Sequence, residues 1–399
     1  MDLKEKMLGR VKPSASEQKE AENKVSKFLE RLNKKLKDAR AIIGGSFAKG
    51  TWLKDNHDVD IFVLFNNDHE CSDELEKVLK KVFGKVTRIH GSRDYFNINI
   101  YDLNFEIVPV YKIERPKDAK NITDISPLHA KWVRSKLNTE LADDIRLAKL
   151  FFKAQGIYGA ETYIKGFSGY VIEILTIHFG GFDKLIKTGS KMHIWDAVNP
   201  RGKKRVIIDK EKLSPLVVVD PVQDNRNAAA ALSAEKFNKF VKACNAYLSQ
   251  PSEKFFEIKK VKLSDLKDKT LVIRASPLEG TKDVVGTKLY VVYGKILYYL
   301  TVEGFEVTSS GWSWDEEGLY WFNVKSKELS KYKEQAGPPL DIEEHVRSFK
   351  AKHKGKKIVE KDGRVYVVLL RKHVKLKDYV IYILKSDEIK KRVKRIKVV

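Results

Sequence analysis

The chain has 399 residues, of which 42% are hydrophobic and 10% aromatic, so it can form more than one packed core and is not a disordered protein. Its two cysteines exclude a disulfide framework and a cysteine-based zinc cluster, and no apolar run approaches the roughly 18 residues of a membrane span. The charged N-terminal residues do not predict a signal peptide, and we expect a cytoplasmic protein that does not enter a membrane.

The net charge of +23 is concentrated toward one end of the chain. Residues 347–399 contain 19 Lys and Arg against 5 Asp and Glu, a net charge of +14. Such an excess favours a polyanionic partner, because neutralised phosphates release counterions and drive sequence-independent binding. A lysine-rich surface of the kind found in thermophiles is the alternative explanation.

The first part of the chain predicts an α+β domain with a small mixed sheet. Ser14 and Glu17 have capping-box spacing, and apolar residues then recur at helical intervals. A second helix is expected near residues 73–82. The predicted strands cover residues 41–43, 58–65, 96–101 and 105–110.

The rest of the chain changes character twice. From about residue 127 to 248 the pattern is mostly helical, and residues 167–179 form a nearly continuous apolar segment that we expect to be buried. After Pro251, β-like runs at residues 271–273, 289–293 and 319–322 alternate with helical stretches. Asp362-Gly363 lies between two apolar runs and predicts a hairpin. We therefore predict three domains, which are residues 1–130, 131–255 and 256–399.

Three acidic residues carry the strongest chemical signal. Asp58 and Asp60 are two apart on a predicted strand, so their carboxylates point to the same face. Such a pair needs water or cations, and Mg²⁺ suits it because it prefers hard oxygen ligands and substrate phosphates. Glu106 begins a segment that could lie beside this strand. Three carboxylates on adjacent strands could hold two metal ions, one activating an attacking hydroxyl and one stabilising a leaving pyrophosphate.

A glycine-rich turn supplies a second part of this site. Glycines let the backbone of Gly44-Gly45 approach phosphates, and a helix starting near Ser46 would direct free N–H groups toward them. Ser46 adds a hydroxyl and Lys49 a positive charge. An isolated Asp-x-Asp is usually a solvated strand face, but a Gly-Ser twelve residues before it, with a third acid on a later strand, is far more specific.

This combination is the nucleotidyltransferase signature of the DNA polymerase β-like superfamily, and the chain more closely resembles the archaeal (class I) CCA-adding enzymes, which rebuild the 3′ end of tRNA. The resemblance covers about residues 40–235, whereas the C-terminal third is similar only in general character. It rests on GSFAKGTWL (45–53), DVDIF (58–62), IVPVYK (107–112), PLHAKW (127–132), GIYGAE (156–161), GFSGY (166–170), and VDPV (219–222) through Arg226-Asn227.

The resemblance implies a polymerase β-like catalytic head, a helical nucleotide-selecting neck and a basic α/β region that holds tRNA. It implies template-independent addition of C, C and A from CTP and ATP, with a two-metal Mg²⁺ site. The residues that it assigns are Asp58, Asp60 and Glu106 as metal ligands and catalytic carboxylates, Ser46 and Lys49 as triphosphate contacts, His129, Lys149 and Tyr158 as contacts to the incoming nucleotide, and Arg226 as a residue that helps to select C and A over G and U.

Two positions depart from the family pattern, and several have an ordinary structural explanation. Glu106 stands where the family usually has Asp, and Lys49 where Arg is common, which loses bidentate geometry but keeps the charge. His129 could cap a helix, and a single lysine such as Lys149 is ordinarily part of a solvated helix face. Tyr158 could be a packed loop aromatic. Arg226 could form a surface ion pair with nearby Asp224.

Two other functions stay open from the sequence. One is a different RNA-tailing enzyme, of the poly(A) or poly(U) type, on the same catalytic head. The other is a non-catalytic RNA-binding paralogue in which Glu106 has impaired the chemistry. The oligomeric state is not predicted either, and a homodimer is one alternative.

Overall fold

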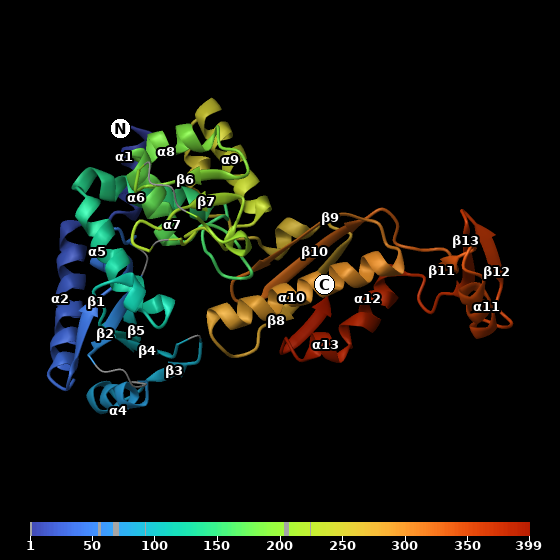
Figure 1. Ribbon diagram of the computed structural model, residues 1–399, viewed down its shortest axis with the longest axis horizontal. Helices are drawn as coiled ribbons and strands as arrows, with labels where there is room; N and C mark the ends of the chain where they lie inside the picture. The colour runs from blue at the N-terminus through green and yellow to red at the C-terminus, as the bar shows by residue number, and fades with distance from the viewer. Residues whose placement is uncertain (1, 55–56, 67–71, 92, 203–206, 224) are drawn as a thin grey trace. The chain divides into compact units, whose positions relative to one another are not determined.

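The computed structural model describes residues 2–54, 57–66, 72–91, 93–202, 207–223 and 225–399. The chain divides into two compact units, residues 1–259 and 260–399 (Figure 1). The predicted domain boundary after residue 255 lies close to this division, and the one after residue 130 falls inside unit 1. Among the described residues, no helix has both the length and the apolar character needed to cross a bilayer.

Unit 1 contains a five-stranded mixed sheet in the order β1-β2-β5-β4-β3. Only β2 and β5 run parallel, and the other neighbouring strands are antiparallel. The predicted mixed α+β sheet is thereby confirmed. Its strands are β1 (Ala39–Ile43), β2 (Asp58–Phe65), β3 (Thr87–Ile89), β4 (Tyr95–Ile100) and β5 (Leu103–Tyr111).

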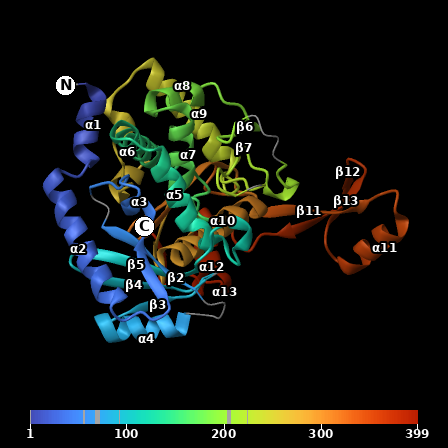
Figure 2. The ribbon, with the colours of Figure 1, turned by 60° about the vertical axis from the view of Figure 1, so that its left-hand side comes forward.

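One face of this sheet is covered by two helices, α2 and α4 (Figures 1 and 2). α2 (Ala15–Asn33) starts at the predicted capping box, in which Ser14 and Glu17 bond reciprocally. Phe28 of α2 stacks on Phe105 of β5 with ring centroids 3.9 Å apart. Val59, Ile61 and the other alternate residues of β2 are buried in this core, so Asp58 and Asp60 point to the opposite face.

The remainder of unit 1 is mostly helical, as predicted. A large core, rich in Phe, joins α1, α6, α7, α8 and α9, with a two-stranded parallel sheet beside it. The further elements of unit 1 are α1 (Leu3–Val11), α3 (Gly45–Ala48), α4 (Ser72–Phe83), α5 (Ser126–Lys136), α6 (Thr139–Ala154), α7 (Gly169–Phe179), α8 (Phe182–Gly189), α9 (Ala234–Ser249), β6 (Asp196–Val198), β7 (Leu216–Val218), and the 3-10 turns η1 (Pro116–Asp118), η2 (Ile122–Ile125), η3 (Lys210–Lys212) and η4 (Glu253–Phe256).

Unit 2 contains two antiparallel sheets. The four-stranded sheet has the order β14-β8-β10-β9 and shares a core with α10 and α12, and the three-stranded sheet has the order β11-β13-β12 and packs with α11. The elements are η5 (Leu263–Leu266), β8 (Leu271–Ser276), α10 (Lys282–Glu303), β9 (Val307–Trp314), β10 (Gly318–Val324), β11 (Tyr332–Pro339), α11 (Glu343–Lys352), β12 (Ile358–Lys361), β13 (Arg364–Leu370), α12 (Leu376–Leu384), α13 (Asp387–Lys390) and β14 (Arg395–Val398).

One predicted element of unit 2 is wrong. Residues 289–293 were expected to be β-like, but they lie inside α10, which Thr281 caps at its start and Gly304 ends in the left-handed conformation. The buried residues Leu289, Val292 and Ile296 have helical spacing, but the apolar residues between them hide it. The hairpin prediction is confirmed, because Asp362 and Gly363 both have positive φ and join β12 to β13.

Candidate active site

The three predicted carboxylates lie on two neighbouring parallel strands. Asp60 of β2 is the register partner of Glu106 of β5, and Asp58 is the partner of Asn104. All four side chains therefore share the sheet face that α2 and α4 leave uncovered. The Asn104 side-chain amide donates a hydrogen bond of 2.9 Å to Oδ1 of Asp58, which fixes that carboxylate.

Burial makes two of these carboxylates, Asp60 and Glu106, costly to ionise. Burial raises the pKa of Glu106 to about 7, and the charges of Asp60 and Asp58 add to the shift. The pKa of Asp60 is raised mainly by burial and further by Asp58, while Lys49 and Lys149 act in the opposite direction. A cation between the carboxylates would relieve this repulsion, so the donor set suits a hard metal ion.

A further oxygen on this face has no hydrogen-bond partner. Asn97 of β4 is the register partner of Glu106, and its buried Oδ1 accepts no hydrogen bond. In the part of the chain that the structure describes, no three His, Cys, Asp or Glu side chains converge closely enough to form a metal site by themselves. A cation here would accordingly take part of its coordination from water and phosphate oxygens, as Mg²⁺ commonly does.

The glycine-rich turn lies directly against Asp60. The backbone N–H of Gly44 donates a 2.7 Å hydrogen bond to the backbone oxygen of Asp60, and Gly45 has φ +55°. Residues 45–48 then form α3, a single helical turn that includes Ser46. The chain turns back at Gly50, and the backbone N–H of Thr51 donates to the carbonyl of Ser46 at 3.0 Å.

Lys49 and Lys149 meet on one buried carboxylate, that of Glu173. The Nζ atom of Lys49 lies 2.6 Å from one Glu173 oxygen, and that of Lys149 lies 2.8 Å from the other. Lys149 also donates to the hydroxyl of Thr51 at 2.9 Å. Lys149 is only 3% exposed, so the interpretation of a solvated helix face is wrong for it.

Tyr158 lies close to the same group of charges. Burial raises its pKa, and the nearby negative charges of Glu173, Glu161 and Asp60 raise it further. The ammonium group of Lys153 lies 5.1 Å from the centre of the Tyr158 ring. The phenol is therefore a neutral hydrogen-bonding group at neutral pH.

His129 and Arg226 meet on a second buried carboxylate, that of Asp220. Nε2 of His129 lies 3.1 Å from Oδ2 of Asp220, and Arg226 forms an ion pair with the same oxygen. The Tyr170 hydroxyl donates to the other oxygen at 3.1 Å, and its ring stacks on His129. Burial alone would raise the pKa of Asp220, but His129, the backbone N–H of Val222 and Arg226 outweigh it and lower the pKa.

Glu173 and Asp220 were not among the predicted site residues. The apolar segment at residues 167–179 contains one acidic residue, Glu173, and an acid buried in an apolar helix needs a cationic partner. That signal could have identified Glu173. Asp220 follows three valines, which similarly indicates a buried acid. The residue proposed as the surface partner of Arg226, Asp224, lies outside the described residues.

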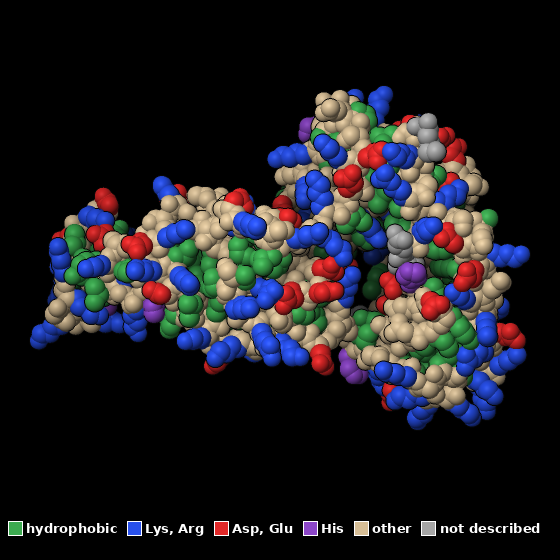
Figure 3. Space-filling model, turned by 180° about the vertical axis from the view of Figure 1, so that it is seen from behind, with side chains coloured by type: hydrophobic (Ala, Val, Ile, Leu, Met, Phe, Trp, Pro, Cys, Tyr) green, Lys and Arg blue, Asp and Glu red, His purple; other side chains and the backbone are tan. Residues whose placement is uncertain are grey.

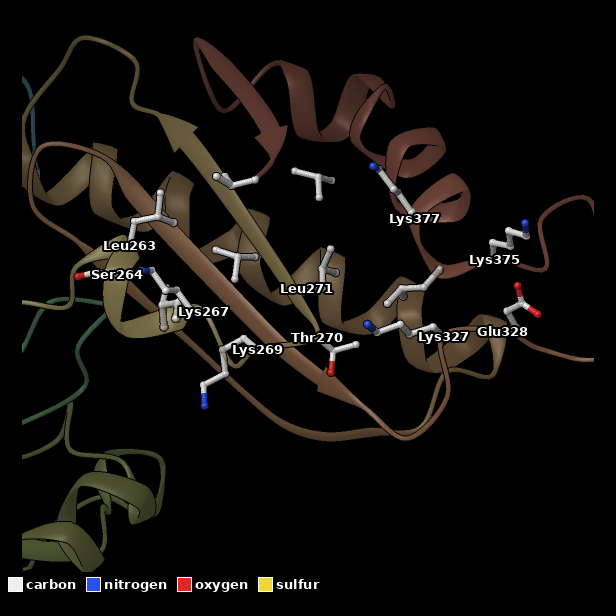
Figure 4. A pocket seen from close by; sticks show the side chains of 15 residues that line it. Leu263, Ser264, Lys267, Lys269, Thr270, Leu271, Lys327, Glu328, Lys375 and Lys377 are labelled. Atoms are coloured by element: carbon white, nitrogen blue, oxygen red, sulfur yellow. The ribbon is translucent and has the colours of Figure 1, made fainter.

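A cavity in unit 2 contains none of these groups. It has a volume of about 800 Å³ and lies beside β8, the end of β14 and the start of α12. In Figure 4, Leu271 lies at its centre, and Lys327 and Lys377 lie at its edge. Lys and Arg side chains also line the visible face of unit 2 (Figure 3), consistent with the concentration of positive charge in this part of the chain.

Three family models match consecutive parts of the chain. Residues 25–129 match a nucleotidyltransferase domain, and residues 143–257 match the second domain of tRNA nucleotidyltransferase. Residues 272–396 match the C-terminal domain of the CCA-adding enzyme. The carboxylates and Lys49 thus belong to the first matched region, and Lys149, Glu173 and Asp220 to the second.

Curated relatives match over most of their length. The chain is 33% identical over 380 residues to the CCA-adding enzyme of Sulfurisphaera tokodaii, which covers 94% of this chain and 89% of that protein. It is 34% identical over 343 residues to the CCA-adding enzyme of Nanoarchaeum equitans, which covers 82% and 83%.

Solved structures share the fold at low sequence identity. Cid1, an RNA terminal uridylyl transferase, gives a TM-score of 0.51 at 14% identity, covering 65% of this chain and 98% of that one. Cid1 poly(U) polymerase bound to Mg and 3′-dATP gives 0.50 at 15% identity, covering 64% and 98%. These likenesses, together with the observed mixed sheet, confirm the nucleotidyltransferase fold.

Proposed function

The chain belongs to the CCA-adding enzyme family, and from this membership we infer that it adds C, C and A to the 3′ end of tRNA. CTP and ATP are the nucleotide substrates, and pyrophosphate is released. The observation that carries the proposal is the face of β2 and β5, where three carboxylates lie near two lysines that are tied to Glu173.

The carboxylates are proposed to hold Mg²⁺. Asp58, Asp60 and Glu106 would bind it. The raised pKa of Glu106 supports this, because a bound cation would offset the burial and the neighbouring negative charges that raise it. When bound, a pair of such ions supplies Lewis-acid stabilisation to the attacking 3′-hydroxyl and to the leaving pyrophosphate. The protein itself places the three carboxylates on one face of two neighbouring strands.

The remaining site residues are proposed to contact different parts of the incoming nucleotide. Ser46, Lys49 and Lys149 are proposed to contact the triphosphate, and Tyr158 and His129 the sugar. Arg226 is proposed to help select C and A, because its planar guanidinium is a fixed fork of donors that can match acceptors of C and of the phosphate of A, and Asp220 holds it in place. The basic surface of unit 2 is proposed to hold tRNA through its phosphates.

A nucleotide-addition assay tests the function directly. The purified protein is incubated with Mg²⁺, each labelled NTP separately, and tRNAs that end before CCA, after C, or after CC. We expect CTP to extend the first two substrates, ATP to complete the third, and GTP and UTP to be ignored. Long homopolymer tails would instead assign a different RNA-tailing activity to the same catalytic domain.

Absence of incorporation with tRNA still bound would favour the non-catalytic paralogue. A Glu106→Asp variant separates the cases, because revival of an inactive wild type by Asp would show that Glu106 impairs the chemistry. A homodimer is a further hypothesis, and analytical ultracentrifugation of the purified chain tests it.

A further inference from the structure

Glu173 is the common partner of the two lysines that are proposed to contact the triphosphate. Its Oε1 accepts hydrogen bonds from Lys149 at 2.8 Å and from the hydroxyl of Thr51 at 3.0 Å, and its Oε2 accepts one from Lys49 at 2.6 Å. The Glu173 side chain is fully buried. Each carboxylate oxygen is thus committed to a different lysine.

We propose that Glu173 is a positioning residue, which fixes the ammonium groups of Lys49 and Lys149 at the spacing needed to bind the triphosphate of the incoming nucleotide. This inference rests on the proposed function and adds to it a residue that touches no substrate. Lysine carries its charge on a long flexible side chain, so each ammonium group must otherwise be ordered at the moment of binding. Glu173 orders both beforehand.

The position of Glu173 also links two parts of unit 1. Lys49 and Thr51 belong to the region that matches the nucleotidyltransferase domain, whereas Lys149 lies on α6 and Glu173 on α7 in the region that matches the second domain. The loop that follows α3 is therefore attached to α6 and α7 through the same carboxylate. A displaced loop would carry Lys49 away from Lys149.

Charge balance explains why an acid is needed at this position. Two ammonium groups brought together without an anion repel each other strongly in a buried place. Burial alone would raise the pKa of Glu173, but Lys149 and Lys49 outweigh it and lower the pKa to about 2. The three groups keep one net positive charge, which leaves the site attractive to a phosphate.

The protonation of Lys149 depends on Glu173. Burial lowers the pKa of Lys149, and Lys49 and Lys153 lower it further, whereas Glu173 raises it. Thr51 faces the same ammonium group but carries no charge. Removing the carboxylate should therefore let Lys149 lose its proton at a lower pH than in the wild-type protein.

A second ion pair between the same elements provides a matched control. Asp143 of α6 pairs with Arg146, and Arg146 donates to the carbonyls of Gly50 and Trp52. This pair also joins α6 to the loop after α3, but it contacts neither Lys49 nor Lys149. Asp143→Asn removes the carboxylate that holds Arg146 and also pairs with Lys12, so it should weaken the attachment of the loop through Arg146 without releasing Lys49 or Lys149.

The test measures ATP addition to tRNA ending in CC, together with equilibrium binding of ATP. For Glu173→Gln we expect KM and Kd for ATP to rise about tenfold or more, with kcat changed by less than about threefold. Both constants should rise with pH more steeply than in the wild-type protein, since Lys149 then loses its proton at a lower pH. Asp143→Asn should lower thermal stability while leaving KM and Kd within about twofold of wild type.

Glu173→Asp keeps the proposal testable if the Glu173→Gln protein does not fold. It keeps the charge but is one methylene shorter, so it can reach only one lysine well, and an intermediate rise in Kd is expected. Unchanged ATP binding in a folded Glu173→Gln or Glu173→Asp protein would overturn the proposal. An equal rise in Kd in Asp143→Asn would also overturn it, because the effect would then belong to loop attachment in general.

Equilibrium binding separates this proposal from the proposed function. A wild-type protein that binds ATP but adds none to tRNA would contradict the proposed function. Weaker ATP binding in Glu173→Gln would still support positioning by Glu173 in that case.

Discussion

The carboxylate of Asp60 occupies the space that a side chain on Gly45 would need. A Cβ atom added to Gly45 would lie 1.5 Å from Oδ2 of Asp60, and Gly45 has φ +55°. Only glycine can adopt this positive φ and lie this close to Asp60 without displacing the carboxylate. The close approach of the loop to β2 is therefore a direct consequence of this residue.

Gly45→Ala should lower the rate of nucleotide addition by about 100-fold or more, because it moves the carboxylate of Asp60. The free energy of unfolding should fall by about 1–3 kcal/mol. Gly84→Ala is the control, since Gly84 has φ +81° but no atom within 4 Å of the added Cβ. Gly84→Ala should lower the free energy of unfolding through the same backbone strain but keep full activity. Steady-state kinetics and denaturant unfolding distinguish these outcomes, and an active Gly45→Ala protein would contradict the assignment.

Asp58→Ala and Asp60→Ala should each reduce turnover by roughly 10³-fold or more, equivalent to about 4 kcal/mol of transition-state stabilisation. Circular dichroism and tRNA binding should stay close to wild type, because both side chains point away from the core formed by α2 and α4. Glu235→Ala serves as the control, because its side chain is 82% exposed. Wild-type rates in either aspartate variant would disprove the proposed metal site.

Glu106 should make Mg²⁺ binding depend on pH near neutrality. Its pKa is raised to about 7, chiefly by burial, and a metal ligand must be deprotonated. Without Mg²⁺, this raised pKa contributes stability below the unfolded-state pKa, and that stability is lost as pH rises through about 7. With a chelator present, Tm should fall as pH rises from about 4.5 to about 7, and added Mg²⁺ should restore more stability at pH 8. Glu106→Gln should remove most of the pH dependence of Tm and of Mg²⁺ binding. An unchanged pH dependence in this variant would show that Glu106 is not its cause.

Asp220→Asn should weaken base selection more than it weakens catalysis. The carboxylate holds Arg226 and contacts His129, so its loss lets the guanidinium adopt other positions. We expect the ratio of kcat/KM for ATP over GTP to fall about tenfold, which corresponds to ~1.4 kcal/mol. Tyr170→Phe removes one hydrogen bond to the same carboxylate and should have a smaller effect. Unchanged discrimination in Asp220→Asn would separate Arg226 from base recognition.

The sequence predicted best where a local pattern determines the structure. The strand at residues 58–65 was predicted with its observed bounds, because acidic and apolar residues alternate at its start and an apolar run follows. The capping box at Ser14 and the hairpin at Asp362-Gly363 were likewise predicted from local chemistry. The prediction failed at residues 289–293, where continuous apolar character conceals the helical period of α10.

The long-range pairing of charged side chains was beyond the sequence. Lys149 and Glu173 are 24 residues apart and Lys49 is farther still, so their meeting depends on how α6 and α7 pack against the loop. Likewise, the ordinary structural alternative for Arg226 was a surface ion pair with nearby Asp224, whereas Arg226 pairs with buried Asp220. The chemistry of each residue was visible in the sequence, but its partner was not.

One helix face of α7 carries a link to each end of the proposed nucleotide. Tyr170 contacts Asp220, and Glu173, three residues later, holds the two lysines. Residues at this spacing share one side of a helix and are only about 4.5 Å apart along its axis. A displacement of α7 would therefore shift the contact to Asp220 and the contacts to the two lysines together. A small movement of α7 would then change the proposed base recognition by Arg226 and the proposed triphosphate binding by the two lysines at the same time.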